Sequence, residues 1–516
     1  MDDNTVFQRG AQPEQPPKTQ TGHPIVQEVV VPEPQTQPLP AVSIPPASPQ
    51  QPMQPLPNPA VVKPMWQQQS PPPQKPVSPD LENGNGFPFT GILKVVIGIV
   101  VLLVIAFLLV KVVLPKFSKG TPQTVTLAYW GLWDDENVMK GVLADFQKQN
   151  PTITVVYTKE NVKDYRDRVL TRMQNGNGSD VFLFHNTWLP EMSSVLTPLP
   201  TDVIGADTFQ KTYYPVVVSD LTKNGAIYGM PIGIDTLSLF INSEIFQNAG
   251  ATAPTNWEDF GKVARSLTVE DEQGKIKTAG AAIGTFDNIT HAPDLIALLF
   301  VQNGVNLLNL SATSKSVSDA LDFYTSFAKD QGKVWDDTLD PSQLAFAKGN
   351  LAMYFGYSWD IFTIKALNPN LSFQVVPVPH LPGRDTTIAS YWANGVSIKS
   401  KHQKEALLLL KYLSQKDVSQ KIFSEESKVR LFGEPYAQID LSDSLKSNKL
   451  VYPFVLQANN AASSYFASNT YDNGLNDHMN GYLGNAVRSI LGNTSTDTAV
   501  EQLYKGVAQV EAQYGQ

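Results

Sequence analysis

Three short stretches decide the fold class of this chain: Val125-Thr-Leu-Ala-Tyr-Trp130, Ile153-Thr-Val-Val-Tyr157 and Val181-Phe-Leu-Phe184. Each is a run of β-branched, aromatic and aliphatic residues, which is typical of a strand. The segments between them, about Val138–Gln149 and Val162–Asn175, have the composition and spacing of helices. Repeated strand–helix–strand units predict a parallel sheet covered by helices, and therefore an α/β fold.

Aromatic and amide side chains follow two of these predicted strands. Trp130 and Trp133 come after the first strand, and Asn186 and Trp188 come after the third. In such sheets ligands bind beyond the carboxyl ends of the strands. Flat rings can cover the apolar faces of a sugar, while amide and acidic groups can hold its hydroxyls. We therefore take these four residues as candidate ligand contacts; packing of the strand end is the competing interpretation for the two tryptophans of the first strand.

A long apolar segment precedes this region. The run from Val95 to Val110 holds no polar side chain, and Lys94 and Lys111 flank it. With its flanks it reaches about 20 residues, which is the length needed to cross a bilayer of about 30 Å. The sequence predicts one permanent transmembrane helix at 90–115, followed by a linker at 116–123. The lysines after the span favour a cytoplasmic C-terminus, which conflicts with the exported domain expected below, so the flanking charges do not settle the orientation.

The N-terminal segment 1–89 has a different composition from the rest of the chain. It contains more than half of the 39 prolines, interleaved with glutamine and serine. Proline lacks a backbone donor, and the few aromatic residues cannot build a core. We expect a disordered, partly polyproline-II tail. It serves either as a solvated spacer or as a ligand for a proline-binding groove, for instance around 52–59.

Composition excludes several classes of function. The net charge is −9 without a basic stripe, which argues against nucleic acid as a partner. The chain has no cysteine, so disulfides, thiolate metal sites and lipidation at cysteine are excluded. Its six histidines are scattered, and no zinc-protease, nucleophile-elbow or Walker motif occurs. We therefore expect no enzyme, no cofactor and no metal.

From residue 124 onward, the order of segments resembles the extracellular, periplasmic-type solute-binding proteins of ABC importers (family 1), the family that includes maltose-binding protein. The resemblance rests on blocks that keep the family's order and spacing across 124–516. They are Asn177–Phe182, similar to a "PDV" strand; Asn224–Pro231, similar to "GKIYGLP"; Asp235–Asn242, the crossover strand; Ala251–Phe260; Phe346–Met353, similar to "AFxxGxAAM"; the turn Gly356–Trp359; and Val375–Pro379 with Tyr391–Ile398 before a helix at Lys404–Leu413.

The resemblance implies a two-lobed fold of the periplasmic-binding-protein type (type II), with a solute held in the cleft between the lobes. One lobe would consist of 124–234 with 379–414, and the other of 235–378 with 415–516. The chain would cross the hinge three times. Proteins of this family hand their solute to an ABC permease, which is the partner the resemblance implies.

The resemblance and the residues together add further candidate contacts. Asp235 lies in an apolar context on the crossover strand, where an unpaired carboxylate is costly. It either holds the solute or fixes the hinge by a structural hydrogen bond. Trp359 aligns with a stacking aromatic of the family, Trp392 and Asn394 lie beside a second strand, and Tyr482 falls where the family often adds an aromatic residue. Helix packing is the competing interpretation for Tyr482.

The sequence thus predicts a membrane-anchored, extracellular, monomeric binding protein. Its solute is expected to be a small carbohydrate, its anchor one helix, and its N-terminal tail cytoplasmic. The alternative is a sensing or surface-scaffold module of the same fold that binds a membrane partner protein.

Overall fold

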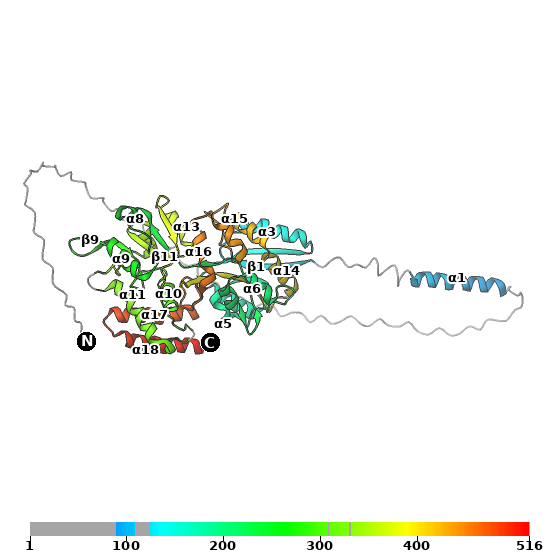
Figure 1. Ribbon diagram of the computed structural model, residues 1–516. Helices are drawn as coiled ribbons and strands as arrows, with labels where there is room; N and C mark the ends of the chain where they lie inside the picture. The colour runs from blue at the N-terminus through cyan, green and yellow to red at the C-terminus, as the bar shows by residue number, and fades with distance from the viewer. Residues whose placement is uncertain (1–88, 109–123, 308, 330–331, 515–516) are drawn as a thin grey trace, which may run out of the picture. The chain divides into compact units, whose positions relative to one another are not determined.

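The computed structural model describes residues 89–108, 124–307, 309–329 and 332–514 (Figure 1). The predicted tail up to residue 88 and the predicted linker at 116–123 lie outside these residues. Helix α1 (Phe89–Leu108) begins one residue before the predicted membrane segment at 90–115 and overlaps most of it; the remaining residues of that segment are also outside the described part. Among the described residues, no helix has the length and apolarity required to cross a membrane. The described residues from 124 onward belong to one compact unit, and both large sheets lie in it.

The first sheet contains the three strands that decided the predicted fold class. Its order is β2 (Ile153–Lys159), β1 (Val125–Gly131), β3 (Val181–His185), β14 (Trp392–Val396) and β6 (Met230–Pro231). β1 runs parallel to both β2 and β3, whereas β14 runs antiparallel to β3 and β6. The three strands on which the parallel sheet was predicted are therefore parallel, as expected. β14 runs against them, and β6, which is antiparallel to β14, has the same direction as the first three. β14 is reversed because the chain re-enters this sheet at the edge where β3 ends.

The two helices predicted between these strands are present. They are α3 (Glu136–Gln149) and α4 (Tyr165–Gln174), each within a few residues of the predicted bounds. The buried side chains of α3 are apolar, which gives it one face for packing on the sheet. The periodicity of the sequence was sufficient to predict these two helices, because each helix carries its own amphipathic pattern.

The second sheet is mainly antiparallel. Its order is β12 (Phe373–Val376), β8 (Ser238–Asn242), β11 (Leu351–Gly356), β10 (Ile276–Ala281) and β9 (Val269–Glu270). Only the pairing of β10 with β11 is parallel; the other pairs run antiparallel. At β10 the backbone of α9 (Trp257–Leu267) comes so close that a Cβ on Gly280 would lie 1.7 Å from the carbonyl oxygen of Ala264. Glycine therefore allows this helix to pack directly on the sheet.

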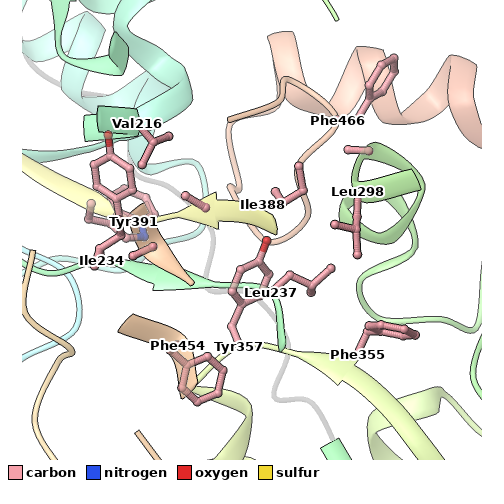
Figure 2. Packing of buried hydrophobic residues seen from close by; sticks show 14 of the residues in the cluster. Val216, Ile234, Leu237, Leu298, Phe355, Tyr357, Ile388, Tyr391, Phe454 and Phe466 are labelled. Carbon is pink, nitrogen blue, oxygen red and sulfur yellow. The ribbon is translucent and has the colours of Figure 1, made fainter. Parts of the chain in front are cut away.

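A third, small sheet lies where the chain passes between the two large ones. It consists of β15 (Ala461–Ala462), β13 (Thr387–Ser390) and β7 (Asp235–Thr236). β7 connects β6 of the first sheet to β8 of the second, and β13 connects β12 of the second to β14 of the first. Figure 2 shows buried side chains on both sides of this connection, with Ile388 and Leu237 between Tyr391 and Phe355.

Helices cover both sheets. The C-terminal pair packs together and also contacts α10 and α11 (Figure 1). α15 contacts α3, and Lys421 of α15 forms an ion pair with Asp145 of α3. The remaining longer helices are α6 (Ala206–Thr212), α7 (Pro215–Asp220), α8 (Ser243–Ala249), α9 (Trp257–Leu267), α10 (Ala292–Gln302), α11 (Ser314–Thr325), α12 (Ser342–Ala347), α13 (Asp360–Leu367), α14 (Gln403–Leu413), α15 (Lys416–Glu426), α17 (Leu475–Leu491) and α18 (Thr496–Tyr514).

Candidate functional site

Several rings meet at the edge of the first sheet where β1 and β3 end. β14 begins at this edge, because Trp392 pairs with His185. The ring centroid of Trp392 lies 5.3 Å from that of His185, 5.4 Å from that of Trp133 and 5.0 Å from that of Trp188. We call these four residues the tryptophan cluster. The structure thus brings together three of the tryptophans that the sequence singled out.

The members of the tryptophan cluster differ in exposure. Trp188 is fully buried and Trp392 is 9% exposed, whereas Trp133 is 38% exposed. Burial lowers the pKa of His185 to about 3, so its imidazole is neutral near pH 7. Its two nitrogens lie 2.8 Å from the Thr187 hydroxyl and 3.0 Å from the Ser390 hydroxyl. The cluster is therefore tightly packed and uncharged. Only Trp133 exposes a substantial part of its ring to solvent.

A cavity of about 560 Å³ lies beside this edge. One wall comes from the residues after β3 and from α7, and the other from the segment before α17, at 461–466. Its volume falls within the range of about 300–1,000 Å³ that is usual for small-molecule sites. Apolar residues line part of it, and its polar lining includes Asn186, Thr187, Asp220, Lys223, Ser463 and Tyr465.

Asp220 is the centre of the polar contacts in this cavity. Its Oδ2 accepts hydrogen bonds from the Asn186 amide at 3.0 Å, from the Tyr391 hydroxyl at 2.8 Å and from the Ser463 hydroxyl. Burial raises the pKa of Asp220 to about 6, although the three hydrogen bonds act in the opposite direction. The cavity therefore contains a carboxyl group that titrates close to neutral pH.

Asn186 connects the two walls. Its Nδ2 donates to Ser463 Oγ at 3.0 Å as well as to Asp220, while its Oδ1 accepts from the backbone N–H of Tyr391. The side chain is 3% exposed, so its donors and acceptor are used in a fixed arrangement. Of the residues predicted from the sequence, Asn186 is the one that lines the large cavity.

The indole of Trp359 stacks on the ring of Tyr357. It follows β11 and lies parallel to Tyr357, with centroids 4.4 Å apart and an interplanar angle of 18°. Tyr357 is fully buried, and Trp359 is partly exposed. A partly exposed indole supported on one face is a suitable stacking surface, although Trp359 does not line the large cavity.

The structure places the other candidates away from the large cavity. Trp130 packs beneath the Arg172 guanidinium of α4, and Asn394 accepts a hydrogen bond from the Tyr129 hydroxyl at 2.8 Å. Asp235 is fully buried in the small connecting sheet, where burial raises its pKa well above the ordinary value. Tyr482 lies against α18 and donates its hydroxyl to Gln509 at 3.1 Å. Their roles in binding stay predictions.

Sequence reasoning missed the polar residues at the centre of the cavity. Asp220 ends a short helix, and Ser463 lies in a stretch of small residues before α17. Neither position carries a motif or a periodic pattern. The two residues are 243 positions apart in the sequence, and they come into contact only in the folded chain. A single sequence gives no signal for such a long-range contact.

Metal binding has no support in the described part of the chain. No group of three or more histidine, cysteine, aspartate or glutamate side chains there is arranged to hold a metal ion. The site is thus built from hydroxyl, amide, carboxyl and aromatic groups.

Comparison with known proteins identifies the family. The family model described as bacterial extracellular solute-binding protein matches residues 141–449. The chain belongs to this family. This solute-binding protein is 24% identical over 326 residues to the multiple sugar-binding protein of Streptococcus mutans, which covers 60% of the chain and 75% of the relative. The family consists of binding proteins, not enzymes.

Two solved structures show the same fold. The sugar-binding protein MalE of Xanthomonas citri is 21% identical with a TM-score of 0.61, covering 75% of this chain and 98% of that chain. A solute-binding protein of an ABC transporter from Thermotoga lettingae is 20% identical with a TM-score of 0.58, covering 75% and 100%. The expected α/β fold of the periplasmic-binding-protein type is confirmed for this solute-binding protein.

Proposed function

We propose that this chain is the carbohydrate-binding component of an ABC importer. The observation that carries the proposal is the cavity of about 560 Å³ with Asp220, Asn186 and Ser463 at its centre. A sugar presents hydroxyls that donate and accept hydrogen bonds, together with apolar C–H faces. The cavity offers matching partners, because it combines a carboxyl group, an amide and hydroxyls with apolar and aromatic lining.

Asp220 is the strongest proposed contact. Within the described part of the chain its hydrogen bonds go to Oδ2, so Oδ1 can accept from a solute hydroxyl. A hydrogen bond to an ionised carboxylate is about twice as strong as a neutral one. We propose that Asn186 and Tyr391 hold this carboxylate and that Trp133 and Trp359 supply stacking surfaces.

The relatives support a sugar rather than another solute. The Streptococcus mutans relative is named a multiple sugar-binding protein, and the Thermotoga lettingae structure holds α-D-tagatose. Other structures of the same fold hold maltotetraose or mannobiose. The comparisons do not favour a sensing or scaffold module.

An ABC permease is the proposed partner, and we propose that the protein is monomeric.

The proposed lobes follow the two large sheets. One lobe contains the first sheet, at 124–234 with 379–414, and the other contains the second, at 235–378 with 415–516. The packing of α15 on α3 argues for assigning α15 to the first lobe instead. On either assignment, the large cavity has walls from both lobes, since 186–223 and 461–479 contribute to it.

We propose further that the segment 90–115 anchors the protein in the cell membrane, with the tail in the cytoplasm and the lobes outside. The support is the apolar run in the sequence and the exposure of the large apolar side chains that α1 presents, including Ile97, Leu102, Leu103 and Phe107. Water-exposed apolar groups in this number call for an apolar surrounding. Release of the intact protein from cells without detergent would contradict the anchor.

The test of the proposed function is thermal unfolding of the full-length protein in mild detergent. The panel contains D-tagatose, maltodextrins and mannobiose, with amino acids and polyamines as other classes. A solute that binds only the folded state adds about 2.7 kcal/mol of stability at a hundredfold excess over its dissociation constant.

A shift with a sugar is expected, and Asp220→Ala should abolish it. The exposed Asp207→Ala on neighbouring α6 is the matched control and should leave the shift unchanged. If folded protein responds to no sugar, or if Asp220→Ala keeps the full response, the proposal is wrong.

A further inference from the structure

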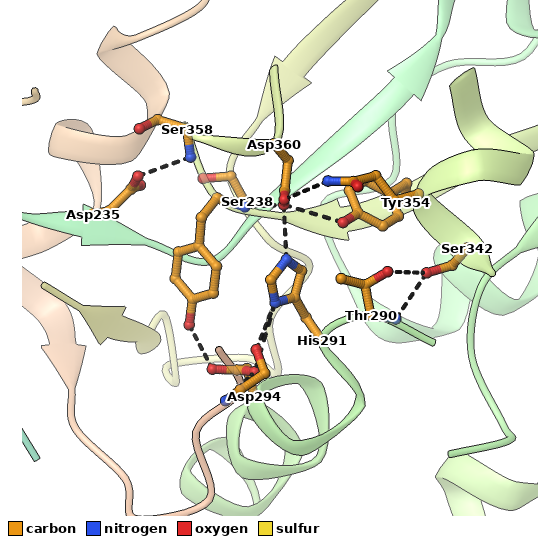
Figure 3. A network of polar contacts seen from close by, with 12 residues as sticks. Asp235, Ser238, Thr290, His291, Asp294, Ser342, Tyr354, Ser358 and Asp360 are labelled. Atoms are coloured by element: carbon orange, nitrogen blue, oxygen red, sulfur yellow. Dashed lines mark hydrogen bonds and ion pairs between the residues drawn. The ribbon is translucent and has the colours of Figure 1, made fainter. Parts of the chain in front are cut away.

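The turn that carries Trp359 has two backbone donors, and each is bound by a buried carboxyl group. The N–H of Tyr357 donates to Asp360 Oδ2 at 2.9 Å, and the N–H of Ser358 donates to Asp235 Oδ2 at 2.8 Å (Figure 3). Asp360 is 2% exposed and Asp235 is fully buried. These two bonds fix consecutive peptide units directly before the indole.

Asp235 reaches this turn from the small connecting sheet. It lies on β7 of the connecting sheet, where it pairs with Ser390 of β13. Its second oxygen, Oδ1, accepts the N–H of Thr236 at 2.9 Å. Both oxygens are thus used by the backbone, and the residue does not line the large cavity. Asp235 acts as a brace between the hinge and the turn, not as a surface for a solute.

Several side chains hold the Asp360 carboxyl group in place. Its Oδ2 also accepts from the Tyr354 hydroxyl at 3.1 Å and lies 2.8 Å from His291 Nε2, while its Oδ1 accepts from Gln343 at 2.7 Å (Figure 3). The Asp360 carboxyl group can lie this close to the backbone of residue 356 because that residue is glycine. A Cβ on Gly356 would lie 2.4 Å from Asp360 Oδ2.

The ring beneath the indole is fixed as well. The Tyr357 hydroxyl donates to Asp294 Oδ1 at 2.9 Å, and Asp294 Oδ2 accepts the N–H of Ser468 at 3.1 Å. Ser468 follows the segment 461–466 that forms one wall of the large cavity. The support of Trp359 is therefore continuous with the cavity wall through Tyr357 and Asp294.

From these contacts we infer that Asp235 and Asp360 are positioning residues for Trp359. They set the affinity for the solute by holding the two peptide N–H groups before the indole, and they do so without touching the solute. Specificity for ring size then depends on the angle at which this turn presents Trp359. The inference rests on the proposed function, since it assigns Trp359 a solute to stack on.

The test begins without any solute. Full-length protein labelled with 5-fluorotryptophan gives one fluorine resonance for each of the eight tryptophans, and Trp359→Phe identifies the resonance of Trp359. Asp235→Asn keeps the size of the side chain but leaves only one acceptor oxygen for two backbone donors. We expect the Trp359 resonance to shift or broaden while the resonances of tryptophans distant from Asp235, such as Trp257 and Trp335, stay in place.

The matched control is Asp180→Asn. Asp180 also accepts a backbone N–H, from Ala128 at 2.8 Å, but it precedes β3 at the opposite end of the first sheet. This variant should leave the Trp359 resonance unchanged. Should Asp235→Asn fail to fold, Asp360→Asn gives the same test at the neighbouring N–H. An unmoved Trp359 resonance in a folded variant would overturn the inference, whatever the sugar panel shows.

The second measurement uses the sugar that stabilises the wild-type protein most. Asp235→Asn should weaken its binding about tenfold in the wild-type background, which is of the order of one net hydrogen bond, and hardly at all in the Trp359→Phe background. Full additivity of the two losses would mean that Asp235 affects solute binding independently of Trp359, which overturns the positioning role.

Discussion

Thr187 Oγ1 donates a hydrogen bond to Asn476 Oδ1 over 2.8 Å, and both side chains are buried. Thr187 follows β3 of the first sheet, and Asn476 lies in the first turn of α17. Together with the bond between Asn186 and Ser463, this contact joins the two proposed lobes along one side of the large cavity. On the proposed assignment, these two hydrogen bonds hold the proposed lobes in contact at this side of the cavity.

Removing the Thr187 hydroxyl should favour opening. Thr187→Val keeps the shape of the side chain and leaves Asn476 without this donor. A net hydrogen bond is worth about 1 kcal/mol, so the closed population should fall about fivefold relative to the open one. Because the chain has no cysteine, Lys148→Cys on α3 and Lys315→Cys on α11 give one clean pair of spin labels. A longer distance between the labels is expected.

Thr197→Val is the matched control for this experiment. Its hydroxyl is buried but has no hydrogen-bond partner among the described residues, so the same exchange breaks no bond between the lobes. The distance between the labels should stay at the wild-type value. Equal distances for Thr187→Val and Thr197→Val would show that the Thr187 hydroxyl does not hold the lobes together.

Solute affinity should depend on pH through Asp220. The folded-state pKa is raised from 3.8 to about 6, so the carboxyl is neutral below this value and ionised above it. Ionisation gives the stronger acceptor for a sugar hydroxyl, and affinity should therefore fall as the pH drops through about 6. Tyr391 and Tyr465 near Asp220 have raised pKa values and stay neutral in this window.

Calorimetric titration with the stabilising sugar at several pH values measures this dependence. In Asp220→Asn the step near pH 6 should disappear and affinity should be weak throughout. The same carboxyl has the opposite effect on folding: since its pKa is raised, it destabilises the folded state as the pH rises through about 6. A step that persists in Asp220→Asn would assign it to another group.

Adding a methyl group at Gly506 should destabilise the packing of α17 against α18. A Cβ on Gly506 would lie 2.1 Å from Cδ1 of the Tyr482 ring, so Gly506→Ala forces the two helices apart. We expect a loss of about 1–3 kcal/mol in the free energy of unfolding by urea. Solute affinity should stay unchanged, because Tyr482 is used in packing on α18.

Gly481→Ala is the control within the same helix pair. No atom lies within 4 Å of a Cβ at this position, and alanine favours the helix by about 0.5–1 kcal/mol over glycine. It should therefore leave stability unchanged or raise it slightly. Loss of sugar binding in Gly506→Ala that remains well folded would instead place Tyr482 at the solute.

The elements that carry their own pattern could be predicted from the sequence. The strands at Val125 and Val181 and the helix α3 are defined by local composition and spacing, so they were found within a few residues. The direction of β14 could not be found in the same way. It depends on where the chain returns from the second sheet, which is a property of the whole topology.

The site shows the same division. Trp133, Trp188 and Trp392 could be singled out because tryptophans beside strand ends are conspicuous, and they do form one cluster. Asp220 could not, since its role comes from donors that are distant in sequence, such as Ser463. Asp235 was noticed for the right reason, a carboxyl in an apolar stretch. Whether it faces the solute or the backbone depended on the position of Ser358, 123 residues later.

His291 should make the stability of the protein depend on pH above neutrality. It is fully buried, with Nε2 2.8 Å from Asp360 Oδ2 and Nδ1 3.8 Å from Asp294 Oδ2. Burial alone lowers the pKa of His291, but the charge and hydrogen bond of Asp360 and the charge of Asp294 outweigh it, so the pKa is raised. A raised histidine pKa stabilises the folded state below the unfolded value of 6.5, and this contribution is lost as the pH rises through the folded value.

Urea unfolding from about pH 7 to about pH 9 measures this loss by linkage. The difference in the free energy of unfolding between wild type and His291→Gln should shrink as the pH rises. His185→Gln is the control, because His185 is equally buried but its pKa is lowered to about 3, so it stays neutral across the window. Tyr354 and Tyr357, which face His291, have raised pKa values and do not titrate there. A constant difference for His291→Gln would mean that the pKa of the buried imidazole is not raised by its two carboxyl neighbours.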